Sequence, residues 1–294
     1  MRSVKYLIAA GAASLLSTAA LAADMPSIMP PPPAYYAPPV VEDFGGWYLR
    51  GDIGQTNTRG KLYAPGYDDL STASYTQIGH EFSGGTSVGI GVGYQFNGWL
   101  RADITGEYRS KIKFSGTDFV TGSNGFNYSD SYNGGYYSFV GLFNLYADLG
   151  TWWCITPFIG VGIGGAHNTF SGLQDAGISP LPIFNQTGPG ISQYVNTPTM
   201  YQANAGSKTN FAYALHAGLA YKVSNNFTVE LAYRYLNMGE GITGTGTTFD
   251  ATKTKGRAFQ FQDLTSQDIR LGMRWNLDSG SYLPPPPPPL IRKG

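Results

Sequence analysis

Residues 100–109 decide the fold, and they read Leu-Arg-Ala-Asp-Ile-Thr-Gly-Glu-Tyr-Arg. The even positions carry apolar side chains or glycine, and the odd positions carry arginine, acidic residues or threonine. Successive side chains of a strand point to opposite faces, so this period of two predicts a strand whose faces meet different environments. The pattern returns at residues 268–277, Asp-Ile-Arg-Leu-Gly-Met-Arg-Trp-Asn-Leu. Neither segment alone indicates which face lies inside, so the rest of the chain must decide.

The N-terminal segment has the features of an export signal. Arg2 and Lys5 precede an apolar stretch, residues 6–16, and Ala20-Leu21-Ala22 has the small-x-small pattern of a cleavage site. We therefore predict that residues 1–22 are a signal peptide that is removed on export. No later segment offers eighteen uninterrupted apolar residues, which leaves a closed barrel as the only way for the mature chain to span a bilayer.

The composition favours an exported β protein. The chain has 40 glycines and 21 tyrosines in 294 residues, and only 13% of its residues are charged. Without Arg2 and Lys5, 17 of the 19 basic residues remain against 19 acidic ones. This slightly negative balance excludes a strongly basic nucleic-acid binder, so we expect no nucleic-acid partner. The single cysteine, Cys154, cannot form an internal disulfide, and we expect it to be buried at the rim of the barrel.

Two proline-rich segments flank the predicted barrel. Residues 23–45 contain Pro30-Pro31-Pro32-Pro33, and residues 278–294 contain six consecutive prolines, residues 284–289. Such composition favours extended polyproline conformation over a packed fold. We expect a periplasmic linker before the barrel domain, residues 46–277, and a disordered tail after it.

Between the tails, alternating segments predict eight strands. They lie at residues 46–55, 86–96, 99–111, 136–149, 156–166, 211–223, 227–236 and 266–277. Short links alternate with four long ones, which we expect to be solvated loops at residues 56–85, 112–135, 167–210 and 237–265. Short turns at one end and long loops at the other are typical of outer-membrane barrels. The predicted fold is all-β: an eight-stranded antiparallel up-and-down transmembrane β-barrel with disordered Pro-rich tails.

Aromatic residues indicate which face meets the lipid. The apolar rows carry rings near the strand ends, as expected at the two membrane–water boundaries. These residues are Trp47, Tyr94, Phe96, Trp99, Tyr108, Tyr221, Phe227, Tyr233 and Trp275. The opposite rows hold glycines and charges, for example Gly89, Gly91 and Gly93. A soluble calyx with an apolar lumen is the alternative, but it would place its charges outside.

Several of these segments resemble a known family. The chain is similar to the RopB-type surface antigens, small outer-membrane barrels of alphaproteobacteria, at Gly46-Trp47-Tyr48-Leu49-Arg50-Gly51, at residues 101–109, at residues 157–164 and at Ala232-Tyr233-Arg234-Tyr235. The resemblance implies an abundant eight-stranded outer-membrane protein without catalytic residues. The chain departs from such barrels in continuing for 17 residues after residues 275–277.

The inward rows carry the most informative set of candidate residues. The predicted lumen charge network consists of Arg50, Asp52, Arg101, Asp103, Glu107, Arg109, Asp148, His216, Glu230, Arg234, Asp268, Arg270 and Arg274, and Lys222 is expected to face inward as well. An eight-stranded barrel is only wide enough for its own side chains, and buried charges are costly unless they are paired. The near balance of charge predicts a salt-bridged plug, with a narrow or gated channel as the alternative.

Other motifs point to no chemistry. The glycine runs at residues 89–93 and 160–164 lack the following helix and the acidic residue of a dinucleotide site. His80 and His167 are expected to be surface histidines, although loop histidines could bind a metal or haem iron. The lipid-facing rows show no Ser–His–acid set. We expect no enzymatic activity, no cofactor and no metal.

The sequence therefore predicts a structural barrel of the cell outer membrane that contributes to envelope integrity and surface character. The alternatives are a narrow porin for small solutes or ions and a surface adhesin or haem-binding protein. The expected partners are outer-membrane lipid and lipopolysaccharide, the barrel-assembly machinery and, through the Pro-rich tails, peptidoglycan.

Overall fold

The computed structural model describes residues 45–63, 74–121, 127–185, 188–248, 255–256 and 258–277. All of them belong to one compact unit, Asp43–Gly294. The predicted signal peptide and both Pro-rich segments, apart from Gly45, lie outside the described residues. Among the described residues, no helix is long and apolar enough to cross a membrane.

The described residues form thirteen strands. They are β1 (Gly46–Tyr63), β2 (Ser74–Phe82), β3 (Gly85–Gln95), β4 (Leu100–Thr121), β5 (Asn127–Asp148), β6 (Ile155–Phe184), β7 (Ile191–Ala203), β8 (Gly206–Lys222), β9 (Phe227–Asn237), β10 (Gly241–Ile242), β11 (Gly246–Thr248), β12 (Lys255–Gly256) and β13 (Gln260–Asn276).

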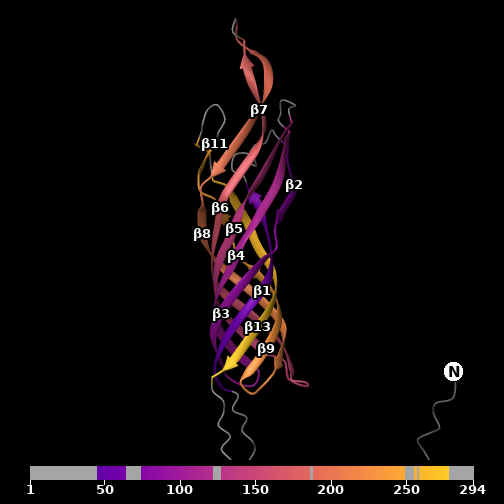
Figure 1. Ribbon diagram of the computed structural model, residues 1–294, viewed down its shortest axis with the longest axis vertical. Coiled ribbons are helices and arrows are strands. Elements are labelled where there is room, and N and C mark those ends of the chain that lie inside the picture. Colours follow the sequence, from indigo (N-terminus) through magenta and orange to yellow (C-terminus); the bar gives the residue numbers. More distant parts are fainter. Residues whose placement is uncertain are drawn as a thin grey trace, which may run out of the picture. The chain divides into compact units, whose positions relative to one another are not determined.

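Eight of these strands pair in a closed cycle (Figure 1). The order is β1, β3, β4, β5, β6, β8, β9 and β13, and β13 pairs with β1 again. Every pair is antiparallel, so each predicted strand exists and neighbours the strands expected for an up-and-down barrel. The prediction of an all-β antiparallel barrel is confirmed. The remaining five strands lie outside this cycle: β2 pairs with β4, β7 with β6, β10 with β13, and β11 with β7 and β12.

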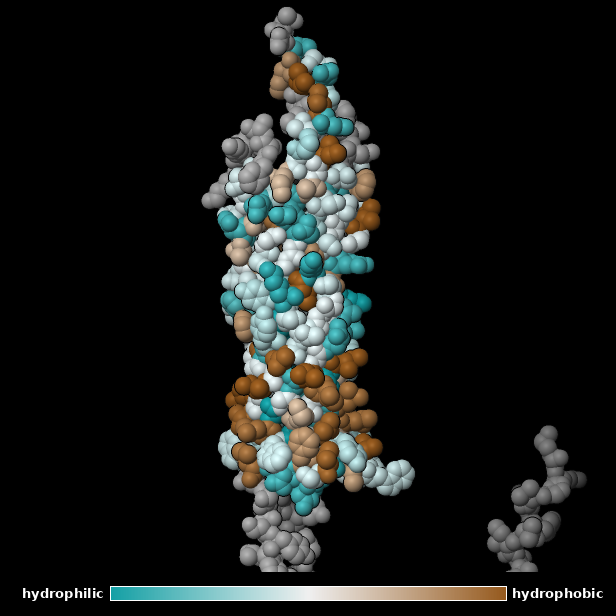
Figure 2. Space-filling model, viewed as in Figure 1, coloured by the Kyte–Doolittle hydropathy of each residue, from teal (hydrophilic) through white to brown (hydrophobic). Residues whose placement is uncertain are grey.

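The ring carries a belt of exposed apolar side chains near its short turns (Figure 2). Ile53, Ile90, Ile104, Leu231 and Leu271 are each about half exposed or more. Rings border this belt on both sides. The border near the short turns contains Trp47, Trp99 and Trp275. The opposite border contains Tyr108, Phe139, Tyr213 and Phe211. The outward positions predicted for the tryptophans and for Tyr108 are correct.

The four long links are the main error of the sequence analysis. Most of their described residues are strand: β1 continues to Tyr63, β4 to Thr121 and β6 to Phe184, and β2 and β7 also lie in these links. The strands continue because residues beyond the belt still alternate, now with apolar side chains inside. We call this part the extension; it comprises the described residues of 57–63, 74–82, 112–136, 168–203 and 258–265.

Bulges separate the belt from the extension. The pairing register shifts between Arg59 and Lys61 on β1 and between Arg109 and Ile112 on β4. On β4, odd positions such as Arg109 face inward before the bulge, and even positions such as Phe114 face inward after it. An extra residue in one strand turns every following side chain to the other face. The apolar residues thereby change from the outer to the inner face.

Candidate functional site: the filled lumen

The structure places all thirteen residues of the lumen charge network in the interior. Each has a relative exposure of 9% or less, and Arg101 and Asp268 have none. Without His216, the network contains six arginines and six carboxylates, so its charges balance. Lys222 does not join it: it lies in register with the buried Thr228 but at the end of β8, where its side chain is exposed.

One part of the network is centred on Arg50 of β1. Its guanidinium donates hydrogen bonds to Asp52 Oδ1 at 2.8 Å, to Asp103 Oδ2 at 2.7 Å and to the Tyr146 hydroxyl at 2.9 Å. Three acceptors thus satisfy one buried cation, and two of them carry the opposite charge. Charge-assisted hydrogen bonds of this length are among the stronger ones in proteins.

A second part is centred on Asp268 of β13. Arg234 approaches Asp268 Oδ2 at 2.6 Å and Glu107 Oε1 at 2.7 Å, and Arg109 approaches Asp268 Oδ2 at 2.9 Å. Arg270 connects the two parts, since its Nη2 lies 3.2 Å from both Asp52 Oδ2 and Glu107 Oε2. The ion pairs therefore form one continuous network across the lumen.

The part nearest the short turns is less completely hydrogen-bonded. Glu230 lies 3.3 Å from Arg101, 3.6 Å from Arg274 and 3.7 Å from Arg50, without hydrogen-bond geometry at its Oε1. Arg101 instead stacks on the Tyr146 ring, at 4.3 Å from its centroid, and forms an ion pair with Asp148 at 3.2 Å. The face of an aromatic ring attracts a cation, so the Tyr146 ring helps to stabilise the Arg101 guanidinium.

Neutral polar side chains complete the network. Asn144 donates to Asp103 Oδ1 at 2.8 Å and to Thr105 Oγ1 at 3.0 Å. Its own carbonyl oxygen lies 3.2 Å from His216 Nε2. Because a carbonyl oxygen only accepts, Nε2 of His216 carries the proton in this arrangement. The inward position predicted for His216 agrees with its burial.

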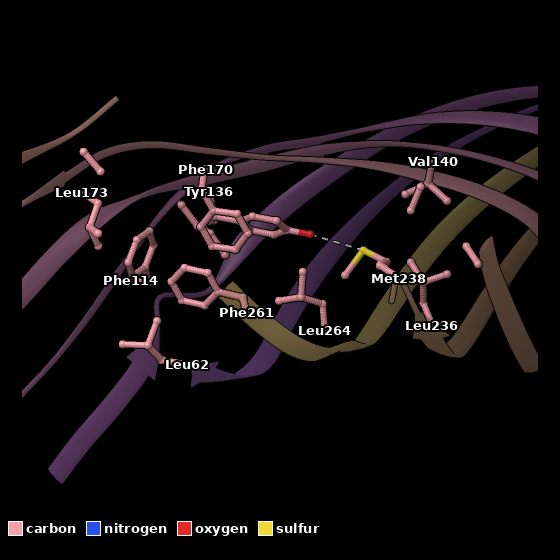
Figure 3. Close-up of a cluster of buried hydrophobic side chains, with 14 of the residues drawn as sticks. Leu62, Phe114, Tyr136, Val140, Phe170, Leu173, Leu236, Met238, Phe261 and Leu264 are labelled. Atoms are coloured by element: carbon pink, nitrogen blue, oxygen red, sulfur yellow. Dashed lines mark hydrogen bonds between the residues drawn. The ribbon is translucent and has the colours of Figure 1, made fainter. Parts of the chain in front are cut away.

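An apolar cluster fills the lumen next to the charges and continues into the extension (Figure 3). Its members are Leu62, Ile112, Phe114, Tyr132, Tyr136, Val140, Leu142, Ala166, Phe170, Leu173, Tyr201, Ala203, Ala212, Ala214, Leu236, Met238, Phe261 and Leu264. Phe170 and Phe261 stack with their centroids 4.0 Å apart. Tyr136 donates its hydroxyl proton to Asn168 Oδ1 at 2.9 Å, so the polar end of its ring is satisfied.

This cluster is not among the predicted features, although the sequence contains a signal for it. Residues 111–114, Lys-Ile-Lys-Phe, alternate as clearly as the belt strands do. The even positions stay apolar as in residues 100–109, but residues 112–114 fall in the predicted long link 112–135, and the bulge that turns them inward has no signal in this alternation.

Two further predictions are wrong. His80 is half buried, not a surface residue: Nδ1 lies 2.7 Å from the Tyr132 hydroxyl, and Nε2 contacts the Gly60 carbonyl. Cys154 is exposed, not buried at the rim, because it lies in a tight turn with a positive φ of 69°. His167 is exposed as predicted, and its Nδ1 lies 2.7 Å from Thr209 Oγ1. No three His, Cys, Asp or Glu side chains of the described segments are placed to hold a metal ion.

The extension contains an acidic group that titrates near neutral pH. Burial and the neighbouring carboxylates of Asp130 and Asp118 raise the pKa of Asp175 to about 7. Burial also raises the pKa of Asp130. These residues lie on β4, β5 and β6, beyond the apolar belt. Protonation of Asp175 removes a repulsion in this part of the sheet.

A family model and several known proteins are similar to this chain. A family model described as outer membrane protein beta-barrel domain matches residues 8–276. Uncharacterized proteins of Brucella abortus and Brucella melitensis are 31% identical over 217 residues, which is 67% of this chain and 69% of each relative. Among solved structures, Neisserial surface protein A is similar with a TM-score of 0.40 and 15% identity, covering 79% of this chain and 97% of its own. OprG of Pseudomonas aeruginosa has a TM-score of 0.40 and 11% identity, with coverages of 79% and 96%.

The family model spans most of the chain, and the eight-strand cycle with its apolar belt is the architecture expected of that family. The chain belongs to the outer membrane protein β-barrel family and is a protein of the outer membrane.

Proposed function

We propose that the protein is a non-conducting structural barrel, of the kind found in RopB-type surface antigens, that contributes to envelope integrity and presents its extension at the cell surface. The observation that supports this most is the filled lumen. Six arginines and six carboxylates occupy one part of it, and the apolar cluster occupies the next. A solute would have to displace both.

The two fillings resist opening for different reasons. Separating a buried ion pair leaves uncompensated charge in a low dielectric, which costs about 3–5 kcal/mol. Opening the apolar cluster exposes large side chains such as Phe170 and Phe261 to water, at about 1.5–3 kcal/mol for each side chain. A path for ions must meet both costs at once, so we expect the barrel to remain closed.

Planar-bilayer recording of refolded protein tests this proposal. We expect no steady conductance from the wild type. Phe170→Ala together with Phe261→Ala removes a stacked pair from the apolar cluster, and Glu230→Ala removes a carboxylate of the network. We expect ion passage only when all three substitutions are combined. Leu271→Ala on the lipid-facing side is the matched control. Steady wild-type conductance would favour the narrow porin instead.

A surface interaction is the second candidate function, and the β6–β7 hairpin supports it. Residues 176–207 contain no charged side chain. Ile178, Phe184, Ile191 and Val195 of this hairpin are exposed. Figure 2 shows apolar side chains at the surface of the upper end of the molecule. Exposed apolar groups of this kind are common at binding surfaces. Replacing residues 179–197 by a short turn should abolish adhesion to host cells if the protein is an adhesin, and should leave outer-membrane assembly unchanged.

The haem-binding alternative has less support. His80 points into the extension and is hydrogen-bonded to Tyr132, whereas His167 faces outward and is hydrogen-bonded to Thr209. The two imidazoles do not share a site. Our proposal includes no catalytic role, and its partners are outer-membrane lipid and lipopolysaccharide, the assembly machinery and, through the Pro-rich segments, peptidoglycan.

A further inference from the structure

A groove with a volume of about 850 Å³ crosses the outer surface of the barrel within the apolar belt. Its floor contains Gly106, Gly141 and Gly165, which pair with one another on β4, β5 and β6. A Cβ atom at Gly106 or Gly141 would meet no other atom within 4 Å. The groove exists because three neighbouring strands lack a side chain at the same level.

Large side chains line the groove on the side of the extension, and a second row follows on the other side of the glycines. Tyr108, Phe139 and His167 lie in register on one side of the glycines. Ile104, Phe143 and Ile163 lie in register on the other side, and each is exposed. Tyr108 and Ile104 are four residues apart on one strand, or about 13 Å. The glycines between the two rows leave the backbone open to a hydrocarbon chain.

The position of the groove indicates what fills it. It is continuous with the belt of exposed apolar side chains, whose surroundings in an outer-membrane protein are lipid acyl chains. Little hydrophobic driving force acts between a chain and a barrel inside a bilayer. Retention of one chain must therefore come from close dispersion contacts and from its headgroup.

Basic side chains lie beyond the wall on the side of the extension. Lys111 and Lys113 are exposed on β4, just past Tyr108. The lysine ion pairs of the described residues join Lys61 to Asp263 and Lys208 to Glu240, so Lys111 and Lys113 have no acidic partner within 4 Å there. Ammonium groups at a membrane surface attract phosphate. His167 adds a polar side chain at one end of the groove.

We propose that this groove holds one acyl chain of a phosphorylated outer-leaflet lipid, with Lys111 and Lys113 facing its phosphate. Short turns of such barrels face the periplasm, which places the opposite rim of the belt in the outer leaflet. The proposal depends on membership of the family and not on whether the lumen conducts.

Native mass spectrometry of detergent-purified protein incubated with lipid A tests the proposal. The wild type should retain one lipid A molecule. Gly141→Leu and Gly106→Leu fill the groove with a side chain that has room to extend, and should reduce the retained fraction about fivefold or more by replacing the dispersion contacts of the chain. Gly51→Leu is the matched control, because Gly51 also faces lipid with no atom near its Cβ position but lies outside the groove.

The headgroup is tested separately. Lys111→Gln with Lys113→Gln should weaken retention of lipid A, and zwitterionic phosphatidylethanolamine should be retained less than lipid A by the wild type. Heat-modifiable gel mobility checks that each variant is folded, and Gly106→Leu replaces Gly141→Leu if only one of them folds. Equal retention by wild type and both groove variants would overturn the proposal, and so would an equal loss in Gly51→Leu. Equal retention of the two lipids by the wild type would overturn the phosphate assignment.

Discussion

The belt and the extension are built from the same strands with opposite distributions of polarity. On β4 the belt has Arg109 inside and Tyr108 outside, whereas the extension has Phe114 inside and Lys113 outside. Lipid surrounds the belt and water the extension, and on this strand the outer face matches its surroundings in each part. The inner face then carries the other half of the alternating side chains, which are paired charges in the belt and an apolar cluster in the extension. Strand pairing alone therefore does not fix which residues form the core; the medium does.

Deleting Ser110 at the bulge of β4 should have the largest effect on the difference between the belt and the extension. The deletion removes the extra residue, so Lys111 and Lys113 would point into the apolar cluster and Phe114 would point to water. We expect loss of the folded species, measured as loss of heat-modifiable mobility. Ser110→Ala keeps the residue count and should fold. Wild-type mobility in the deletion variant would show that the bulge does not set the facing.

Breaking the charge balance of the belt should have the next largest effect. Glu230→Ala leaves Arg101 and Arg274 without a shared carboxylate, and should lower the free energy of unfolding by about 3–5 kcal/mol. The double variant with Arg101→Ala should cost less than the sum of the two single changes. Urea unfolding in micelles measures both. Additive losses would mean that these residues do not act as a pair.

The outer faces can be compared directly. Leu271→Arg places a charge against lipid and should cost about 2–4 kcal/mol of folding free energy, seen as a lower folding yield into vesicles. Ser115→Arg places the same charge on the outer face of the extension and should change stability by less than about 0.5 kcal/mol. Leu271→Met controls for the loss of the leucine. Similar damage from both arginines would contradict the assignment of water to the extension.

The smallest expected effect is a pH dependence confined to the extension. The pKa of Asp175 rises from 3.8 to about 7 on folding, so the folded state binds the proton more tightly than the unfolded state. The stability of this region should therefore fall as the pH rises from about 4 to about 7 and then level off. Hydrogen exchange of β5 and β6, corrected for intrinsic rates, measures this. Asp175→Asn should remove most of the dependence and leave the smaller part that comes from the raised pKa of Asp130, and an unchanged profile in that variant would assign the dependence elsewhere.

The sequence predicted the belt well because lipid outside imposes a strict period of two. The alternation within residues 100–109 and 268–277 is enough to predict strands with charged inner faces, without knowing which strands they pair with. The extension was missed because some of its inner residues, such as Phe170, lie among glycine, serine and threonine in the sequence. Their burial depends on strands that are distant in sequence.

The partners in each ion pair could not be predicted from the sequence for a related reason. The predicted salt-bridged plug agrees with the network of contacts, and Glu107 forms ion pairs with Arg109, Arg234 and Arg270. Glu230 instead lies beside Arg50, Arg101 and Arg274. The central role of Asp268 and Arg50, however, depends on how the strands are staggered around the ring. The exposure of Lys222 depends on where the barrel ends, which periodicity does not define.

The arrangement of these pairs also bears on how the barrel is assembled. Arg109 and Arg234 both meet Asp268 on β13, the last strand of the ring, and Arg109 is 159 residues away from it in sequence. Until β13 takes its place, two buried arginines lack their shared counter-ion. β13 also carries Arg270 and Arg274, so the lumen of an incomplete barrel retains four arginines against five carboxylates and is net negative, in addition to having an open edge. Neutralisation of the lumen thus coincides with closure, so that only a chain synthesised through to its final strand gains the full stability of the fold.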